Sequence, residues 1–272
     1  MCLLPQKEDP EVRATTKRLL PLTLALCLLS LPAPARAQES PAPGDVAALP
    51  PESIMLKMAR VYRNCRSYRD HGEVTTIQLI EGGRAGTERP FATAFVRPDR
   101  FRFQFTDTGL GERSSNYVVW TEGEDVHSWW DAKPGVRNAG TLRDGLTVAA
   151  AVSGGSSVRI PGLLLPQEVG EGGPMIVAAE RMPDATDRDV PCIRIKGKSQ
   201  RTPYSLTQGA QTLTVQDESI TLWIDRATLL LRRVEDRKTF DTYTSESVTT
   251  YTPEIDVEIA PEQLTFNAPQ VP

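Results

Sequence analysis

The stretch F-V-R-P-D-R-F-R-F, residues 95–103, indicates the fold of this chain. Phenylalanines occupy alternate positions from Phe101 through Phe103 to Phe105, which is the period of a β-strand with one apolar face. Pro98 interrupts the pattern directly after Arg97, and a proline that presets φ favours a turn there. The stretch therefore predicts two strands joined by a turn, with an arginine at the turn and a row of aromatic side chains beyond it.

A period of two continues through most of the chain after Gly72, with turn signals such as Gly82-Gly83 between the runs. Short connections favour antiparallel neighbours, because parallel pairing needs long crossovers. About eleven strands are too many for a flat sheet, so we expect the sheet to curl into a barrel or part of one. The predicted strands are residues 73–81, 90–97, 100–107, 115–122, 125–131, 175–182, 190–198, 211–224, 228–238, 244–252 and 255–259.

Three stretches depart from the β pattern. Apolar residues recur at helical spacing over 54–65, after prolines that favour a helix start, and a shorter helical pattern runs from Leu142 to Ala150. The segment 156–166 is too apolar for a free loop, so we expect it to lie against a hydrophobic surface. Its apolar residues are Val158, Ile160, Leu163, Leu164 and Leu165.

Several strands carry apolar residues on both faces, as in Tyr117–Trp120 and Ile220–Ile224. One face of the sheet can pack on helices, and the other must also be shielded from water. A curled sheet does this if its concave side forms a hollow that is covered by helices and by the 156–166 segment. A solid core, filled by the chain's own side chains, is the alternative, and periodicity does not separate the two.

The N-terminal region predicts export. Lys17 and Arg18 precede the apolar run 19–31, and Ala35 and Ala37 fit the small-residue cleavage pattern of a signal peptide. The run is shorter than the roughly 20 residues that span a bilayer, although an uncleaved membrane anchor is the alternative. We expect a signal peptide at 1–37, a Pro-rich linker at 38–50, and a single domain at 51–272.

Composition and motifs argue against several classes of function. The formal net charge is −4, whereas nucleic-acid binding favours a basic patch. The sequence shows no hydrolase, zinc-protease or nucleotide-binding motif, so we expect no catalysis and no cofactor. Asp70, His71 and Glu73 could be imagined as a metal site, but a helix-to-strand junction with a capping aspartate explains them better.

Two cysteines follow the predicted cleavage site, Cys65 and Cys192. An even number of cysteines in an exported protein suggests a disulfide, and their spacing matches no metal or redox motif. Two separate buried thiols are the alternative.

The chain resembles the LolA-like periplasmic carriers of outer-membrane lipoproteins over most of residues 50–270. The resemblance lies in the order of several short motifs. These are V-R-P-D-R-F-R-F at 96–103, the strand pair from Tyr117 to Trp130, T-L-W-I-D-R at 221–226, and the closing segment from Ile259 to Pro269. The insertion at about 132–175 and the loop 199–211 depart from the family pattern.

This resemblance implies an α+β, mainly β fold: an unclosed antiparallel half-barrel with helices covering the concave face. It implies that Arg97 helps to hold a lid and that Phe101 lines an apolar cavity; a surface ion pair of Arg97 with a carboxylate is the alternative. The residues that we expect to bind the ligand are Arg97, Phe101, Phe103, Phe105, Trp120, Trp130, Leu222 and Ile224, under a lid that contains the apolar residues of 156–166.

The expected function is that of a periplasmic carrier, which binds lipoprotein acyl chains or another lipid and passes it towards the outer membrane. An inner-membrane releasing complex and an outer-membrane acceptor are the partners that this role implies. A lipid- or lipoprotein-sensing regulatory module of the same fold, without transport, is the alternative.

Overall fold

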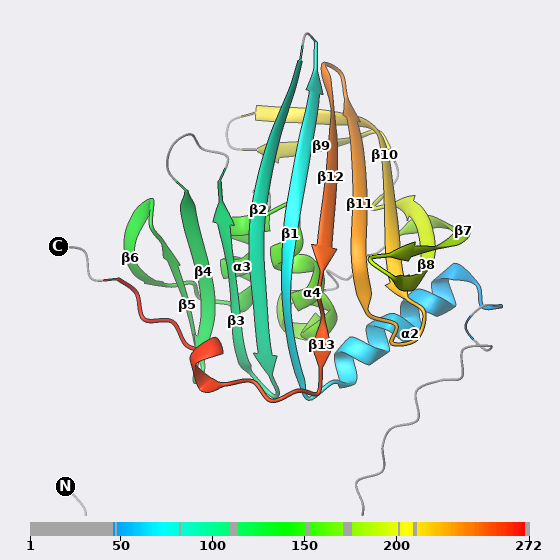
Figure 1. Ribbon diagram of the computed structural model, residues 1–272. Coiled ribbons are helices and arrows are strands. Elements are labelled where there is room, and N and C mark those ends of the chain that lie inside the picture. Colours follow the sequence, from blue (N-terminus) through cyan, green and yellow to red (C-terminus); the bar gives the residue numbers. More distant parts are fainter. Residues whose placement is uncertain are drawn as a thin grey trace, which may run out of the picture. The chain divides into compact units, whose positions relative to one another are not determined.

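In the part of the chain that the structure describes, thirteen antiparallel strands form one sheet, in which eleven strands follow a continuous path (Figure 1). In spatial order these are β6 (Lys133–Asn138), β5 (Asp125–Trp130), β4 (Ser115–Glu122), β3 (Arg100–Asp107), β2 (Gly83–Val96), β1 (Ser67–Ile80), β12 (Tyr243–Tyr251), β11 (Leu231–Phe240), β10 (Gln211–Asp225), β8 (Val190–Lys198) and β7 (Val177–Asp187). The short strands β9 (Tyr204–Gln208) and β13 (Glu254–Ile255) pair with β10 and β1. The end strands β6 and β7 do not pair with each other, so the sheet is unclosed.

The computed structural model describes Val46 and residues 48–269, apart from 82, 109–113, 151–152, 171–175, 201 and 209–210. All of these residues belong to one unit, Ser40–Pro272. The predicted signal peptide at 1–37 lies outside the described residues, as does most of the predicted linker at 38–50. Within that linker Val46 is buried against the core. Among the helices described, none is long and apolar enough to cross a membrane.

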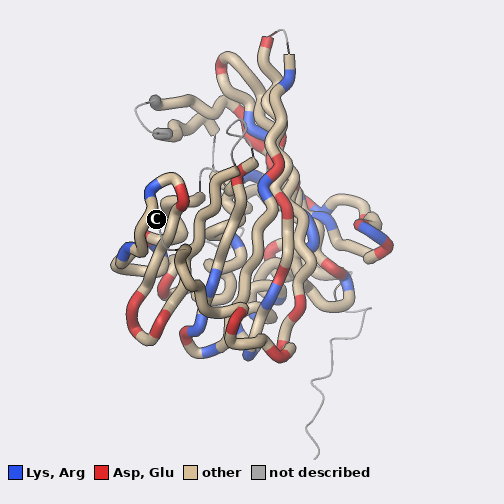
Figure 2. Tube along the Cα trace, turned by 60° about the vertical axis from the view of Figure 1, so that its left-hand side comes forward, with Lys and Arg blue, Asp and Glu red and all other residues tan. Residues whose placement is uncertain are grey.

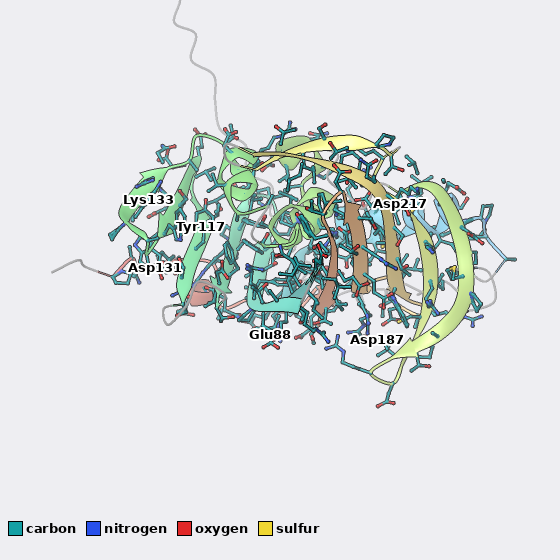
Figure 3. The ribbon with its side chains drawn as sticks, turned by 90° about the horizontal axis from the view of Figure 1, so that it is seen from above. Glu88, Tyr117, Asp131, Lys133, Asp187 and Asp217 are labelled. Carbon is teal, nitrogen blue, oxygen red and sulfur yellow. The ribbon has the colours of Figure 1, made fainter. Side chains whose placement is uncertain are left out.

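Helices cover one face of the sheet. They are α2 (Pro51–Asn64), α3 (Leu142–Ala150), α4 (Ser156–Leu164) and the short α5 (Pro166–Val169). Seen from above, the sheet curves around α3 and α4, and Tyr117 on β4 donates a hydrogen bond from its hydroxyl to the Gly145 carbonyl of α3 at 2.7 Å (Figure 3). The helix-covered face is called the inner face below, and the opposite face the outer face.

The pairing of β1 with β12 joins the two halves of the sheet. Strands β1 to β6 form one antiparallel run along the chain, strands β7 to β12 form the other, and nine residue pairs from Gly72–Tyr251 to Ile80–Tyr243 connect them. Gly72 lies at this seam because a Cβ there would stand 2.2 Å from the Phe91 ring and 2.3 Å from the Thr250 carbonyl oxygen. The seam therefore requires a residue without a side chain at this point.

A C-terminal strap, residues 257–268, covers part of the outer face. The short 3₁₀ helix η1 (Pro261–Gln263) lies within it. Phe266 packs on Trp120 and Trp129, with ring centroids 5.2 and 5.3 Å away. Elsewhere on this face Trp223 lies between two guanidinium groups, those of Arg194 and Arg233. Figure 2 shows basic and acidic residues interspersed along the chain, with no large region of one sign.

The structure confirms the predicted fold class and most of the predicted strands. Strands β6 and β9 were not predicted, because K-P-G-V-R-N lacks an alternating pattern and contains proline and glycine, and Y-S-L-T-Q is short. The predicted strand at 255–259 is reduced to Glu254–Ile255. The apolar 156–166 segment contains a helix, α4, which accommodates Pro161 in its interior.

Candidate functional site

The aromatic row predicted on β3 lies on the inner face. Phe101, Phe103 and Phe105 are buried, and β3 pairs with β2 so that Phe101 is opposite Phe95 and Phe105 is opposite Phe91. Neighbouring rings are close, with centroids 6.3 Å apart for Phe103–Phe105 and 5.8 Å for Phe105–Tyr117. Alternation along paired strands thus produces a continuous aromatic surface.

Three more of the predicted ligand-binding residues share this face. Leu222 and Ile224 on β10 are fully buried in the same cluster, and Trp130 on β5 packs edge-on against Tyr117, with centroids 6.5 Å apart. Trp120 does not belong with them. The pairing of β4 with β3 places Val119 beside Phe103 on the inner face, so the next residue, Trp120, points outward to Phe266.

The predicted lid residues lie in or directly after α4. Ile160, Leu163, Leu164 and Leu165 are buried in the inner-face cluster, and Val158 packs against it while partly exposed. The segment thus covers the sheet with its apolar side, as its composition predicts. The segment is helical, although its prolines gave no indication of a helix in the sequence.

Arg97 links the C-terminal ends of α2 and α4. Its Nε donates to the Cys65 carbonyl at 2.7 Å, and its Nη2 donates to the carbonyls of Tyr62 and Leu164, each at 3.1 Å. These oxygens belong to the C-terminal ends of α2 and α4, where the helix dipole favours a cation. Arg97 thus binds backbone carbonyl oxygens at both helix ends, in place of the surface carboxylate that was the alternative.

Helix side chains pack against the inner face. One continuous buried cluster unites the aromatic row with Ile54, Met58 and Tyr62 of α2 and with Leu142 and Leu146 of α3. In the described part of the chain the helices therefore pack directly on the sheet. A ligand that binds between them would contact side chains of both layers.

A small polar group lies buried at the edge of the apolar cluster. The Asp70 carboxylate accepts hydrogen bonds from the Tyr68 hydroxyl at 2.8 Å and from the Thr93 amide at 3.0 Å. Burial raises the pKa of Asp70 to about 6, against the lowering effect of these two donors. The prediction of a capping aspartate at a helix-to-strand junction was wrong, because β1 already begins at Ser67 and Asp70 points inward from it.

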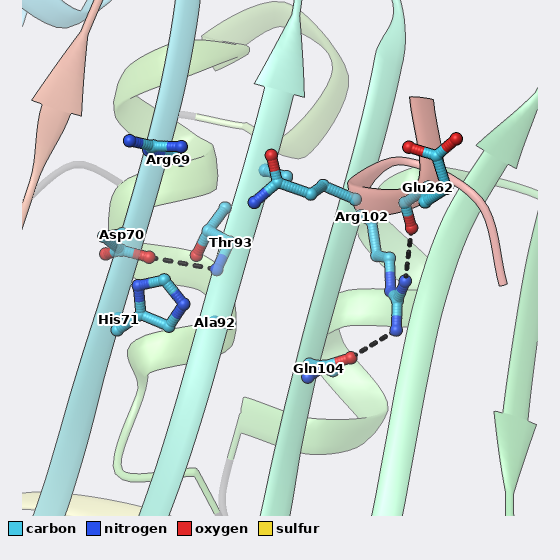
Figure 4. Close-up of a pocket in the computed structure, with 10 residues that line it drawn as sticks. Arg69, Asp70, His71, Ala92, Thr93, Arg102, Gln104 and Glu262 are labelled. Atoms are coloured by element: carbon cyan, nitrogen blue, oxygen red, sulfur yellow. Dashed lines mark hydrogen bonds between the residues drawn. The ribbon is translucent and has the colours of Figure 1, made fainter. Parts of the chain in front are cut away.

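An outer-face pocket was not predicted from the sequence (Figure 4). It has a volume of about 210 Å³ and lies where Ala92 and Ala94 leave space between longer side chains of β1 and β3. Its walls include Arg69, His71, Arg102 and Gln104, and the strap closes it with Glu262 and Gln263.

The two arginines of this pocket are already bonded. Arg69 forms a bidentate ion pair with Glu254 at 2.8 and 3.1 Å. Arg102 donates to the carbonyls of Glu262 and Thr265 at 3.2 and 2.6 Å and to the Gln104 side chain. We therefore interpret the pocket as an attachment point of the strap, because Arg102 is hydrogen-bonded to the strap backbone.

The predicted disulfide is not formed: Cys65 and Cys192 are both free and buried. Cys65 follows α2, and its thiol donates to the Tyr62 carbonyl at 3.1 Å, whereas Cys192 lies on β8, four strands from β1 along the sheet. A disulfide requires Cα atoms within about 7 Å. Burial raises the pKa of Cys65 to about 11, so it is a protonated thiol at neutral pH.

No protein-family model and no curated protein matches this chain. Among solved structures, LprF from Mycobacterium bovis is 11% identical, with 85% of this chain and 100% of that chain covered and a TM-score of 0.42. The LolA superfamily protein NE2245 from Nitrosomonas europaea is 10% identical, with coverages of 80% and 99% and a TM-score of 0.28. A chain of the Pseudomonas aeruginosa MucA/MucB complex is 8% identical, with coverages of 79% and 60% and a TM-score of 0.31. This chain is similar to these structures at low identity and low TM-score, and one of them, NE2245, is a LolA superfamily protein.

Proposed function

We propose that this protein is an exported carrier that binds an acyl chain of a lipoprotein or another lipid on the inner face of its half-barrel. The observation that carries the proposal is the contact of Arg97 with the ends of α2 and α4. The Arg97 side chain links α4, which covers a large apolar surface, to α2 through hydrogen bonds to backbone carbonyls. These hydrogen bonds can break while every pair of strands in the sheet stays intact.

The energetics of exchange support this proposal. Burying an acyl chain of about 16 carbons is worth roughly 12 kcal/mol, at about 0.8 kcal/mol per methylene. Raising α4 exposes four large apolar side chains in it or directly after it, at a cost of roughly 6–12 kcal/mol for Ile160, Leu163, Leu164 and Leu165 together. The two sums are of similar size, so an acyl chain could occupy the sheet surface beneath a raised α4 at little net cost and leave again when α4 returns.

The N-terminal region supports a location outside the cytoplasm. Its residues fit an export signal, and in a two-membrane cell this places the carrier in the periplasm. A carrier there would receive its cargo from an inner-membrane releasing complex and deliver it to an outer-membrane acceptor. Acyl chains are the part of such cargo that the inner face would recognise.

A regulatory module of the same fold is the second candidate. The observation that favours it is the packing of helix side chains on the surface that a cargo would need. In that role the protein would sense lipid or lipoprotein through displacement of α4 and would not carry it. Extraction of the purified protein with organic solvent, followed by mass spectrometry, separates the candidates: co-purifying lipid supports the carrier.

Substitution of Arg97 tests the carrier directly. Arg97→Leu removes the hydrogen bonds to three carbonyls, so the lid should open more readily. A bound fluorescent fatty acid should then leave for acceptor vesicles at least tenfold faster, while the far-ultraviolet circular dichroism spectrum is unchanged. The matched control is Arg100→Leu, an exposed arginine of the same turn, which should transfer at the wild-type rate. Equal transfer by wild type and Arg97→Leu, or no uptake by wild type, would reject the role.

A further inference from the structure

The inner face is divided into an apolar and a polar part. On this face, paired residues of β11, β12 and β1 form rows that run across the three strands. Towards α2 the rows contain apolar residues such as Val234 and Val74, whereas farther along the strands they contain Asp236, Ser247 and Thr76. Thr76 and Ser247 share a hydrogen bond of 2.9 Å. The polar part thus continues the apolar surface along the same strands.

Arg159 lies at the boundary between these two parts. It belongs to the first turn of α4, and its Nη1 donates to the buried Tyr251 hydroxyl at 3.3 Å. Within the described part of the chain no carboxylate oxygen lies within 4 Å of this guanidinium, which has five N–H donors. Arg159 is thus a half-buried cation whose direct partner there is a neutral hydroxyl.

The surroundings of Arg159 favour an anion beside it. A cation in the first turn of a helix opposes the helix dipole, which favours negative charge at that end. Asp236 also favours the charge of Arg159, and its carboxylate is already bonded to Lys238. The buried Ser156 hydroxyl of the same helix turn has no hydrogen-bond partner among the described residues and can donate to an anion. Burial of polar groups and charges without partners is costly.

We propose that Arg159 binds the anionic head group of a lipid, carboxylate or phosphate, whose acyl chain occupies the inner face. The proposal rests on the function proposed above and specifies its substrate class. Helix α4 presents Arg159 in its first turn and Ile160, Leu163 and Leu164 towards its other end. The anionic head group of a lipid that lies along α4 would therefore contact Arg159, and its acyl chain would contact the apolar residues.

The experiment compares three probes of equal chain length: palmitate, hexadecyl phosphate and hexadecanol. Their affinities are measured at pH 8 by competition with a bound fluorescent fatty acid. The wild-type protein should bind the two anions at least tenfold more tightly than the alcohol. Arg159→Met should lose this preference, and Arg159→Lys should keep most of it. Arg143→Met, at an exposed arginine of α3, is the matched control and should resemble wild type.

Each outcome decides a different question. Equal binding of acid and alcohol by the wild type, or an unchanged preference in Arg159→Met, overturns the role of Arg159 and leaves acyl-chain binding in place. Binding of none of the three probes overturns the proposed function together with this inference. Displacement of hexadecyl phosphate by millimolar inorganic phosphate alone would reassign the site to a free anion. If Arg159→Met does not fold, the wild-type and Arg159→Lys comparisons still decide the charge preference.

Discussion

At the scale of single residues, Asp70 couples folding to pH. Its pKa rises from 3.8 to about 6 on burial, so the folded state holds this proton more tightly than the unfolded chain. Folding stability should therefore fall as the pH rises from about 4 to about 6, and this contribution should be constant above that. The shift corresponds to about 3 kcal/mol.

Asp70→Asn tests this coupling, because an amide does not ionise and can still accept the Thr93 amide hydrogen bond. Urea unfolding of wild type and variant should show that the variant gains about 3 kcal/mol relative to wild type between pH 4 and pH 8. Asp125→Asn, at an exposed turn, should differ little from wild type at either pH. A constant difference between Asp70→Asn and wild type across this range would contradict the assignment.

At the scale of elements, the strap depends on Phe266. Its ring contacts Trp120 and Trp129, and the Arg102 guanidinium lies 5.4 Å from its centroid. Phe266→Ala should release the end of the strap and admit water to both indoles. We expect a red-shifted tryptophan emission, a severalfold increase in acrylamide quenching, and a loss of about 1–2 kcal/mol of stability. Asn267→Ala, at the exposed neighbouring position, is the control, and unchanged quenching of Phe266→Ala would show that the strap is fastened elsewhere.

The sequence predicts elements best where one period persists. Strand β3 alternates without interruption, and the predicted bounds of β3 and of β4 agree with the structure. The inner position of Phe101, Phe103 and Phe105 follows from that alternation. Trp120 shows the limit: β4 is apolar on both faces, so only its register with β3 reveals which side chains point inward. The outer pocket depends on three adjacent strands and the strap, a combination that no local pattern contains.

At the scale of the whole molecule, stability depends on the seam between β1 and β12. Gly72→Ala would place a methyl group 2.3 Å from the Thr250 carbonyl oxygen and 2.2 Å from the buried Phe91 ring, and the Thr250 backbone has little room to adjust. We expect a loss of at least about 2 kcal/mol in urea unfolding, from strain where the two halves of the sheet meet. Gly86→Ala, farther along the same sheet with its nearest atom 3.8 Å away, should cost little. Equal stability of the two variants would show that the seam tolerates a side chain at residue 72.

The four tryptophans of the chain are distributed unevenly between the two sides of the sheet. Trp120, Trp129 and Trp223 face outward, whereas Trp130 lies beside Tyr117 on the side of the helices. Optical spectroscopy can therefore monitor the two sides separately. A quencher attached to a hydrocarbon that enters between helices and sheet would reduce the emission of Trp130 and leave that of the other three tryptophans unchanged. The intrinsic emission spectrum could therefore report which side the hydrocarbon reaches, without any attached dye.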